Sequence, residues 1–221
     1  MINPLFKFKI FFLFLLTISS TPSIAQIPYN KQLVQEANSC RFSQPVAAIK
    51  TGYFFFSDSK MREIYDKDGF DIQLCASYPL WNLTGRWTLN AYGAVEYFHR
   101  SGKSINEEQH TSLWSVPVNI GLQPAYTINA DTQYYFSIGP RYFYIRQHND
   151  TSFVDKNRSG KDLGLFVNTG LKYVLCPRFV IDIFGEYSYA KTHFHTGKSG
   201  VYSKNTQVGG FTFGGGLGYK F

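Results

Sequence analysis

The last eleven residues of the chain form the pattern that most restricts its fold. In Phe211-Thr-Phe-Gly-Gly-Gly-Leu-Gly-Tyr-Lys-Phe221 large apolar side chains recur at alternate positions, and the final residue is aromatic. A period of two places these side chains on one face of a β-strand. A terminal strand with an exposed apolar face invites aggregation in water, whereas the closing strand of a membrane barrel turns such a face toward lipid. The pattern therefore predicts a strand that closes a sheet within a membrane.

The same alternation recurs along most of the chain. Eight segments carry it, at 46–57, 70–80, 86–98, 112–123, 133–145, 162–175, 179–190 and 207–221. Each is close to the ~9–11 residues that a tilted strand needs to cross a bilayer. The links alternate between long and polar (58–69, 99–111, 146–161, 191–206) and shorter ones with Pro, Gly, Asn or Asp (81–85, 124–132, 176–178). The sequence therefore predicts an all-β fold, an eight-stranded antiparallel transmembrane β-barrel with meander connections, over residues 46–221.

One face of every predicted strand lacks charged residues. A charge that faces lipid at mid-depth costs about 2–4 kcal/mol, whereas a buried charge is tolerated when it is paired and hydrogen-bonded. Eight strands enclose a space that side chains can fill, so we expect a plugged interior without an open pore. The interior charge network that we expect comprises Lys50, Asp71, Arg86, Glu96, Arg141, Lys172, Asp182 and Glu186. Pro117 and Pro140 lie inside predicted strands, and because each removes a ladder donor we expect a bulge or bend at both.

The amino-terminal residues predict export from the cytoplasm. Lys7 and Lys9 precede an apolar run at 10–18, and Ser23-Ile-Ala25 has the small residues of a cleavage site. The apolar run is far shorter than the ~20 residues of a membrane-spanning helix. We therefore expect a cleaved signal peptide at 1–25 and a short periplasmic leader at 26–45.

The cysteines do not form the framework of a disulfide-rich protein, because there are only three of them. Cys40 and Cys176 are expected on the same side of the membrane, in a compartment where disulfides form. A disulfide between these two residues is one arrangement, and two free thiols are the other. Cys75 is expected to point inward as a small buried residue.

The links contain few residues that suggest chemistry. His193 and His195 would share a face if the strand is extended there, but no Cys or acidic residue lies beside them at ligand spacing, so we expect neither a metal nor a cofactor. His148, Asp150 and Ser152 are close in sequence, but a catalytic set is defined by geometry, so we expect no catalytic site. The third and fourth long links are basic, which suits either lipopolysaccharide phosphates or an anionic host surface.

The ending Gly216-Leu-Gly-Tyr-Lys-Phe221, the signal peptide and the eight alternating segments resemble the small outer-membrane β-barrel proteins. This family includes the transmembrane domain of outer-membrane protein A. The resemblance implies the outer membrane of a Gram-negative bacterium, with both termini periplasmic. It also implies that Leu217, Tyr219 and Phe221 are the signal read by the barrel-assembly machinery, with periplasmic chaperones as partners during export.

We therefore expect an integral outer-membrane protein with a structural role in the envelope and exposed loops suited to adhesion. Its expected partners are outer-membrane lipids and lipopolysaccharide. Two alternatives stay open: a narrow channel for small or hydrophobic molecules, and an enzyme at the barrel rim that modifies lipid A. The formal net charge of +7 is not arranged as an aromatic-spaced basic face, so no nucleic-acid partner is expected. A monomer is expected.

Overall fold

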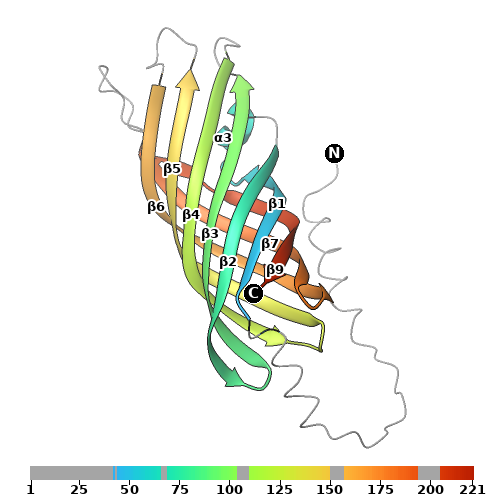
Figure 1. Cartoon of the computed structure of the whole chain (residues 1–221). Helices are drawn as coiled ribbons and strands as arrows, with labels where there is room; N and C mark the ends of the chain where they lie inside the picture. The colour runs from blue at the N-terminus through green and yellow to red at the C-terminus, as the bar shows by residue number, and fades with distance from the viewer. Residues whose placement is uncertain (1–41, 43, 66–68, 104–109, 150–156, 194–204) are drawn as a thin grey trace, which may run out of the picture. The chain divides into compact units, whose positions relative to one another are not determined.

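The computed structural model describes residue 42 and residues 44–65, 69–103, 110–149, 157–193 and 205–221. Figure 1 shows that nearly all of them are in strands, with one short helix. The elements are β1 (Val46–Phe56), α3 (Ser59–Ile64), β2 (Gly69–Thr84), β3 (Trp87–Lys103), β4 (His110–Thr127), β5 (Thr132–Asn149), β6 (Asn157–Cys176), β7 (Phe179–His193), β8 (Asn205–Val208) and β9 (Gly210–Lys220). The expected signal peptide and nearly all of the expected leader lie outside the described residues.

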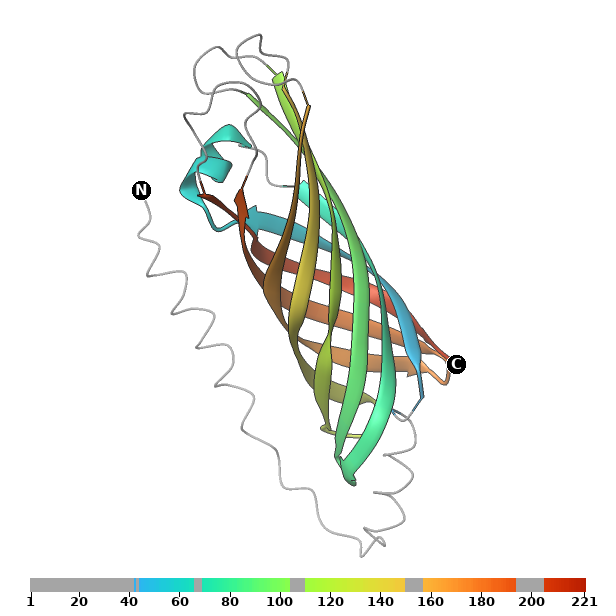
Figure 2. The same ribbon diagram turned by 90° about the vertical axis from the view of Figure 1, so that its left-hand side faces the viewer.

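The strands form a closed antiparallel barrel. Consecutive strands from β1 to β7 pair with each other, and β9 pairs with both β7 and β1, so the ring closes (Figure 2). A path that starts at Val46 and steps from each residue to its partner on the next strand goes once around the ring. It returns to β1 at Phe56, ten residues from its start. For eight strands this stagger corresponds to a strand tilt of roughly 40° from the barrel axis. The predicted eight-stranded meander barrel is confirmed.

The faces of the strands also follow the predicted alternation. In β7, for example, Ile183 points outward and is 66% exposed, while its neighbour Phe184 points inward and is 5% exposed. The rings of Tyr92, Phe98, Tyr135, Phe143 and Phe166 lie inside as well. The barrel therefore presents an apolar outer surface and a mixed aromatic and charged interior.

The eighth predicted strand, 207–221, is split by Gly209. This residue has a φ of 148°, and a Cβ there would meet the backbone of Ser188. β8 and β9 keep the same register on β7, from Ala190↔Val208 to Tyr187↔Phe211, so no residue is inserted at the break. Gly209 therefore bends the strand without shifting it.

We expected a bulge or a bend at Pro117 and at Pro140, and the described pairs show no bulge at either. The paired residues on either side of each proline keep one register along β3–β4 and β4–β5, and only individual pairs are missing. The register shifts among the described pairs lie instead near Pro79, between β2 and β3, and near Cys176, between β6 and β7. A proline thus removes one backbone hydrogen bond between two strands without requiring an extra residue in its own strand.

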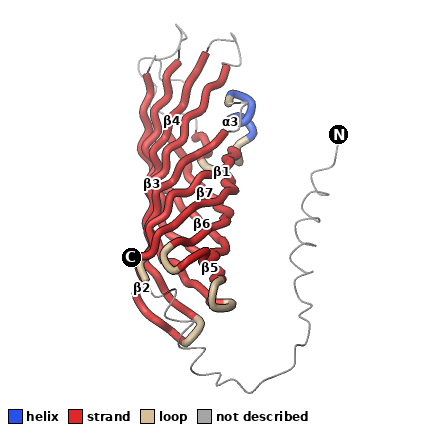
Figure 3. The backbone as a smooth tube through the Cα atoms, turned by 45° about the vertical axis from the view of Figure 1, so that its right-hand side comes forward, coloured by secondary structure: helices blue, strands red, loops and turns tan. Residues whose placement is uncertain are grey.

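The first long link contains the helix α3, which the sequence interpretation treated as a polar loop. Figure 3 shows this helix at one end of the barrel. Its Met61 and the following Tyr65 are buried against inward-facing rings of the strands. Among the described residues, no helix is long and apolar enough to cross a membrane.

Candidate functional site

The two ends of the barrel differ in their connections. We call the end with α3 and the long links the α3 end, and the end with the short turns, Val46 and Phe221, the turn end. The turns at this second end are short, with residues 85–86 between β2 and β3 and residues 177–178 between β6 and β7. The interior between the two ends holds the candidate site.

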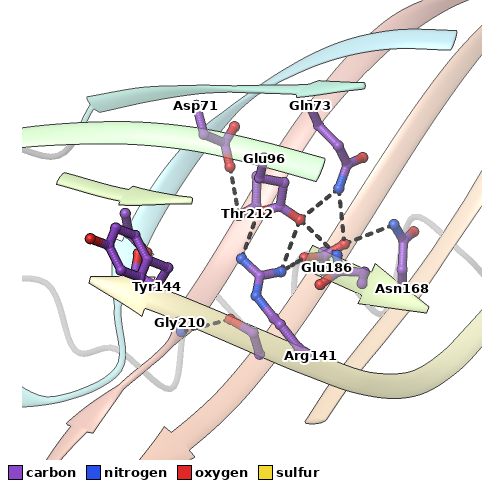
Figure 4. Close-up of polar contacts among 12 residues, drawn as sticks. Asp71, Gln73, Glu96, Arg141, Tyr144, Asn168, Glu186, Gly210 and Thr212 are labelled. Carbon is purple, nitrogen blue, oxygen red and sulfur yellow. Dashed lines mark hydrogen bonds and ion pairs between the residues drawn. The ribbon is translucent and has the colours of Figure 1, made fainter. Parts of the chain in front are cut away.

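A buried ion cluster occupies the middle of the barrel (Figure 4). Both Nη atoms of Arg141 donate to Glu96, at 2.9 Å to Oε1 and 2.5 Å to Oε2, and Nη1 also donates to Glu186. All three side chains are almost completely buried. One guanidinium faces two carboxylates, so uncharged donors must satisfy the remaining acceptor sites. These donors are the side-chain amides of Gln73, Asn119 and Asn168, at 2.7–3.0 Å.

A second ion pair lies nearer the turn end. Lys50 Nζ is 2.7 Å from Asp182 Oδ2, and it also donates to the hydroxyl of Tyr135 at 3.0 Å. That hydroxyl in turn donates to Asp182 Oδ1 at 2.9 Å. The Lys50 ammonium also lies 4.8 Å from the centre of the Phe184 ring. A lysine, an acid and a phenol thus contact one another in a closed triangle.

Two further charged residues of the predicted network have polar neighbours inside the barrel. Lys172 Nζ donates to Ser77 Oγ and Gln123 Oε1, both at 3.2 Å. Lys172 also lies directly opposite Asp182 in the β6–β7 register. Asp71 accepts a hydrogen bond from Thr212 Oγ1 at 3.3 Å. The structure therefore places seven of the eight expected network residues in the interior, in separate groups along the barrel.

Arg86 was wrongly assigned to the interior. It lies in the tight turn before β3, is exposed, and donates from Nη1 to the hydroxyl of Tyr126 at 3.2 Å. The alternation of β3 begins only at Trp87, so a residue in the turn is not held on either face. Arg100, which lay outside the predicted third strand, is the arginine of β3 that is buried, and it donates to the carbonyl oxygens of Gly69, Phe70 and His99.

Apolar side chains close the interior above the ion cluster at the α3 end. Met61 and Tyr65 pack into the barrel mouth, and Arg100 lies over the Phe54 and Phe98 rings at 5.6 and 5.5 Å. Burial raises the pKa of Tyr65 to about 12. The buried members of this apolar cluster are Phe54, Phe56, Met61, Tyr65, Phe98, Leu113, Phe143, Ile145, Ala190 and Val208.

The turn end is closed by a smaller apolar group. Phe42 is buried against Val174 and Val180, which lie at the end of β6 and the start of β7. Between this group and the ion cluster, a cavity beside Lys50 and Asp182 has a volume of about 10 Å³. This is room for about one water molecule. Described side chains therefore occupy the interior at both ends and around the two ion pairs between them.

The other predicted residues lie outside this network. Leu217 and Phe221 are exposed on the outer surface near the turn end, where Tyr219 contacts the rings of Phe179 and Phe221 at 5.5 and 5.2 Å. Cys75 is half-buried against the interior rings, and Cys176 is an exposed free thiol. Cys40 and His195 lie outside the described residues, as do Asp150 and Ser152, so neither the disulfide nor the three-residue catalytic set can be assembled from described atoms. His193 ends β7, and its backbone alone is described.

Solved structures of other proteins share this architecture. Ail, the attachment invasion locus protein of Yersinia pestis, matches at a TM-score of 0.50 and 17% identity, covering 81% of this chain and 99% of Ail. Neisserial surface protein A matches at a TM-score of 0.52 and 17% identity, with 81% and 97% covered. OprG from Pseudomonas aeruginosa matches at 0.51 and 15% identity, with 81% and 96% covered. The chain has the fold of the small outer-membrane β-barrel proteins. No family model matches the sequence, and no curated protein matches it.

The barrel has polar interior partners that the sequence interpretation did not include in the expected network. Gln73, Asn119 and Asn168 carry the amides around the ion cluster, and Tyr135 bridges Lys50 and Asp182. All four lie on the inward face by the same period of two that places the charges. An inventory of every inward polar residue, not of charges alone, would have found them.

Proposed function

We propose that the protein is an integral protein of the outer membrane of a Gram-negative bacterium, with a closed interior and a structural role in the envelope. The α3 end faces the cell exterior, and both termini face the periplasm. This orientation is supported by the length of the connections, because outer-membrane barrels have short periplasmic turns and longer external loops. The apolar outer surface supports insertion in lipid.

The observation that carries the closed-barrel proposal is the filled interior. The apolar cluster of α3, the Arg141 ion cluster, the Lys50 triangle and the Phe42 group follow one another from the α3 end to the turn end. An ion that crossed this interior would have to separate buried, paired charges. Breaking such a pair costs about 3–5 kcal/mol, so the resting barrel does not conduct.

Single-channel recording in planar bilayers tests this proposal. The protein is first shown to be folded by heat-modifiable migration on a gel, and an open porin in the same lipid is the positive control. We expect no stable conductance step from the folded protein. A steady open-channel current from folded protein would favour the narrow channel instead.

The exposed cations at the α3 end suggest a surface role. Lys103, Arg146, Lys161 and Lys191 are exposed there, and no exposed acid lies on the described parts of the same strands. Ail of Yersinia pestis has been crystallised with the heparin analogue sucrose octasulfate. We extend the proposal to contact with anionic glycans, including lipopolysaccharide phosphates and sulfated host glycans.

Binding to immobilised heparin at several salt concentrations tests this surface role. Arg146→Glu combined with Lys161→Glu should weaken binding, and the loss should shrink as salt screens the charges. Arg178→Glu is the matched control, because Arg178 is exposed at the turn end, in the turn between β6 and β7. Equal weakening by the control variant would contradict a site at the α3 end.

The proposal includes no catalytic role. His148 Nδ1 lies 2.7 Å from Asn157 Oδ1, so its ring contacts a side-chain amide. Mass spectrometry of lipid A from cells with and without the protein should give the same profile. A new lipid A species that depends on His148 would establish the enzyme instead. Leu217, Tyr219 and Phe221 are proposed as the signal for the assembly machinery.

A further inference from the structure

One acid inside the barrel lies between two lysines, toward the turn end. Lys50 of β1 and Asp182 of β7 both pair with Gly216 of β9. On its other side Asp182 pairs with Lys172 of β6. A Cβ at Gly216 would lie 2.7 Å from Cγ of Lys50, so only a glycine lets the lysine extend across this position to Asp182. The row therefore places two cations and one anion on the inward face, and all three side chains are buried.

The acid in this row is engaged by one lysine alone. Asp182 Oδ2 lies 2.7 Å from Lys50 Nζ, and Oδ1 accepts from the Tyr135 hydroxyl. Among the described side chains, no ion pair joins Lys172 to an acid. The described acceptors of Lys172 are neutral oxygens, Ser77 Oγ and Gln123 Oε1, both at the long distance of 3.2 Å. A buried charge without a counter-charge is strongly destabilising, so this group needs a further partner.

The other groups of the interior do not supply that partner. The two carboxylates of the Arg141 cluster accept from Arg141 and from side-chain amides, and no described ion pair connects them to either lysine. The Tyr135 ring lies 5.1 Å from Lys50 Nζ and 5.0 Å from Lys172 Nζ. The ring attracts both cations, but it carries no net charge. Lys50, Lys172 and Asp182 together therefore keep a net charge of +1 in a buried place.

The small cavity described above lies at this excess charge. Its volume is about 10 Å³, and Lys50, Lys172 and Asp182 are among the residues that line it. An ammonium has three N–H donors. Lys50 uses two of them on Asp182 and Tyr135, and Lys172 uses two on its neutral acceptors. Each lysine therefore has a third donor beyond these described contacts, and the cavity has room for a single small acceptor.

We propose that this cavity binds one chloride ion, held by the ammonium groups of Lys50 and Lys172. Chloride is a single atom that accepts hydrogen bonds, and its charge brings the group to neutrality. Phosphate, sulfate and carboxylates carry several heavy atoms and exceed the volume. A water molecule would accept the same two hydrogen bonds but would leave the excess charge. Chloride is slightly larger than water, and the flexible side chain of Lys172 accommodates the difference.

The ion stabilises the folded barrel, because the unfolded chain does not bring the two lysines together. This inference does not depend on the orientation or on the envelope role proposed above. Urea unfolding of the full-length protein in vesicles tests it, in sodium chloride and in sodium methanesulfonate at equal ionic strength. Methanesulfonate has the same charge but is too large for the cavity. Above the dissociation constant, the unfolding equilibrium constant should fall about tenfold for each tenfold rise in chloride, and methanesulfonate should give no such change.

Three variants locate the effect. Lys172→Met leaves the neutral pair of Lys50 and Asp182, so stability should no longer depend on chloride. Lys161→Met is the matched control, because Lys161 is exposed at the α3 end, and it should keep the full dependence. Asp182→Asn leaves two cations without an acid, so the dependence should begin at a chloride concentration about tenfold lower or less.

Equal stability of the wild type in the two salts, up to molar concentration, would overturn the proposal. It would show that a water molecule or an uncharged Lys172 occupies this part of the interior. Chloride dependence that persists in full in Lys172→Met would also overturn it, because the ion would then bind elsewhere. If Lys172→Met does not fold, the comparison of salts in the wild type and the shift in Asp182→Asn still decide the question.

Discussion

Replacement of Arg141 by methionine is the sharpest test of how the interior is stabilised. The substitution keeps the length of the side chain but removes the cation that contacts both Glu96 and Glu186. Arg141 is 1% exposed, so neither carboxylate can recover its hydration. Removing one partner of a buried ion pair costs about 3–5 kcal/mol. We expect Arg141→Met to lower the free energy of unfolding by about that amount.

A triple variant, which removes both acids together with the arginine, separates two effects of Arg141→Met. These are the loss of the attraction between Arg141 and the acids, and the cost of leaving the acids buried without a cation. Glu96→Gln and Glu186→Gln, combined with Arg141→Met, leave a cluster with no net charge to bury. Replacing a whole buried ion cluster by uncharged residues is often nearly neutral, so the triple variant should recover most of the lost stability. The amides of Gln73, Asn119 and Asn168 keep their charged acceptors in the single variant and donate to neutral amide oxygens in the triple variant.

The assay is urea unfolding in phospholipid vesicles, followed by tryptophan fluorescence and by heat-modifiable migration. The two probes should give the same midpoint for each variant, as expected of a cooperative transition. If Arg141→Met lowers the free energy of unfolding by less than about 1 kcal/mol, the reasoning is refuted, because leaving a buried charge without a partner costs more than this. A triple variant no more stable than the single one would refute it equally.

Three further predictions concern other parts of the fold. Gly209 has a φ of 148°, so Gly209→Val should cost about 1–3 kcal/mol in unfolding free energy. Gly93→Ala, where the nearest atom to the new Cβ is 3.9 Å away, is the control and should change little; equal effects of the two would contradict the strain argument. Burial raises the pKa of Tyr65 to about 12, so its neutral form is favoured in the folded state, and stability is lost as pH rises above about 10. Tyr65→Phe should therefore lose less stability than the wild type between about pH 10 and 12, and an identical pH dependence in urea titrations would exclude this cause. Cys176 is an exposed free thiol, so gel migration should not depend on reductant; a reductant-dependent shift that Cys176→Ser abolishes would show the disulfide with Cys40 instead.

The period-two pattern predicted which way side chains point, because lipid accepts no charge and the narrow interior accepts paired charges. It could not predict where strands end outside the membrane. β6 begins at Asn157, although the predicted segment began at 162, because hydrogen-bonded pairing continues in water where apolar alternation is no longer required. Arg86 was misassigned for a related reason, since a residue at a tight turn belongs to neither face.

Other features depend on contacts between distant residues. Met61 and Tyr65 are spaced as on one face of a helix, but only the barrel mouth makes their burial favourable, and the sequence gives no direct sign of that mouth. The partners within the ion cluster come from different strands, so single-sequence reasoning names the inward charges but not which acid meets Arg141. For the prolines at 117 and 140, a rule about single residues predicted a bulge or bend. The neighbouring strands nevertheless keep one register on either side of both residues.

The central claim is that apolar side chains face lipid while their neighbours in sequence face the barrel interior. Ile183 and Phe184 test it directly, because they are adjacent in β7 and are 66% and 5% exposed. In a chain whose native tryptophans are replaced by phenylalanine, Ile183→Trp and Phe184→Trp are compared in vesicles that contain lipids brominated at mid-chain. Our account predicts strong fluorescence quenching for Ile183→Trp and little for Phe184→Trp. Equal quenching of the two, or stronger quenching at position 184, would contradict it.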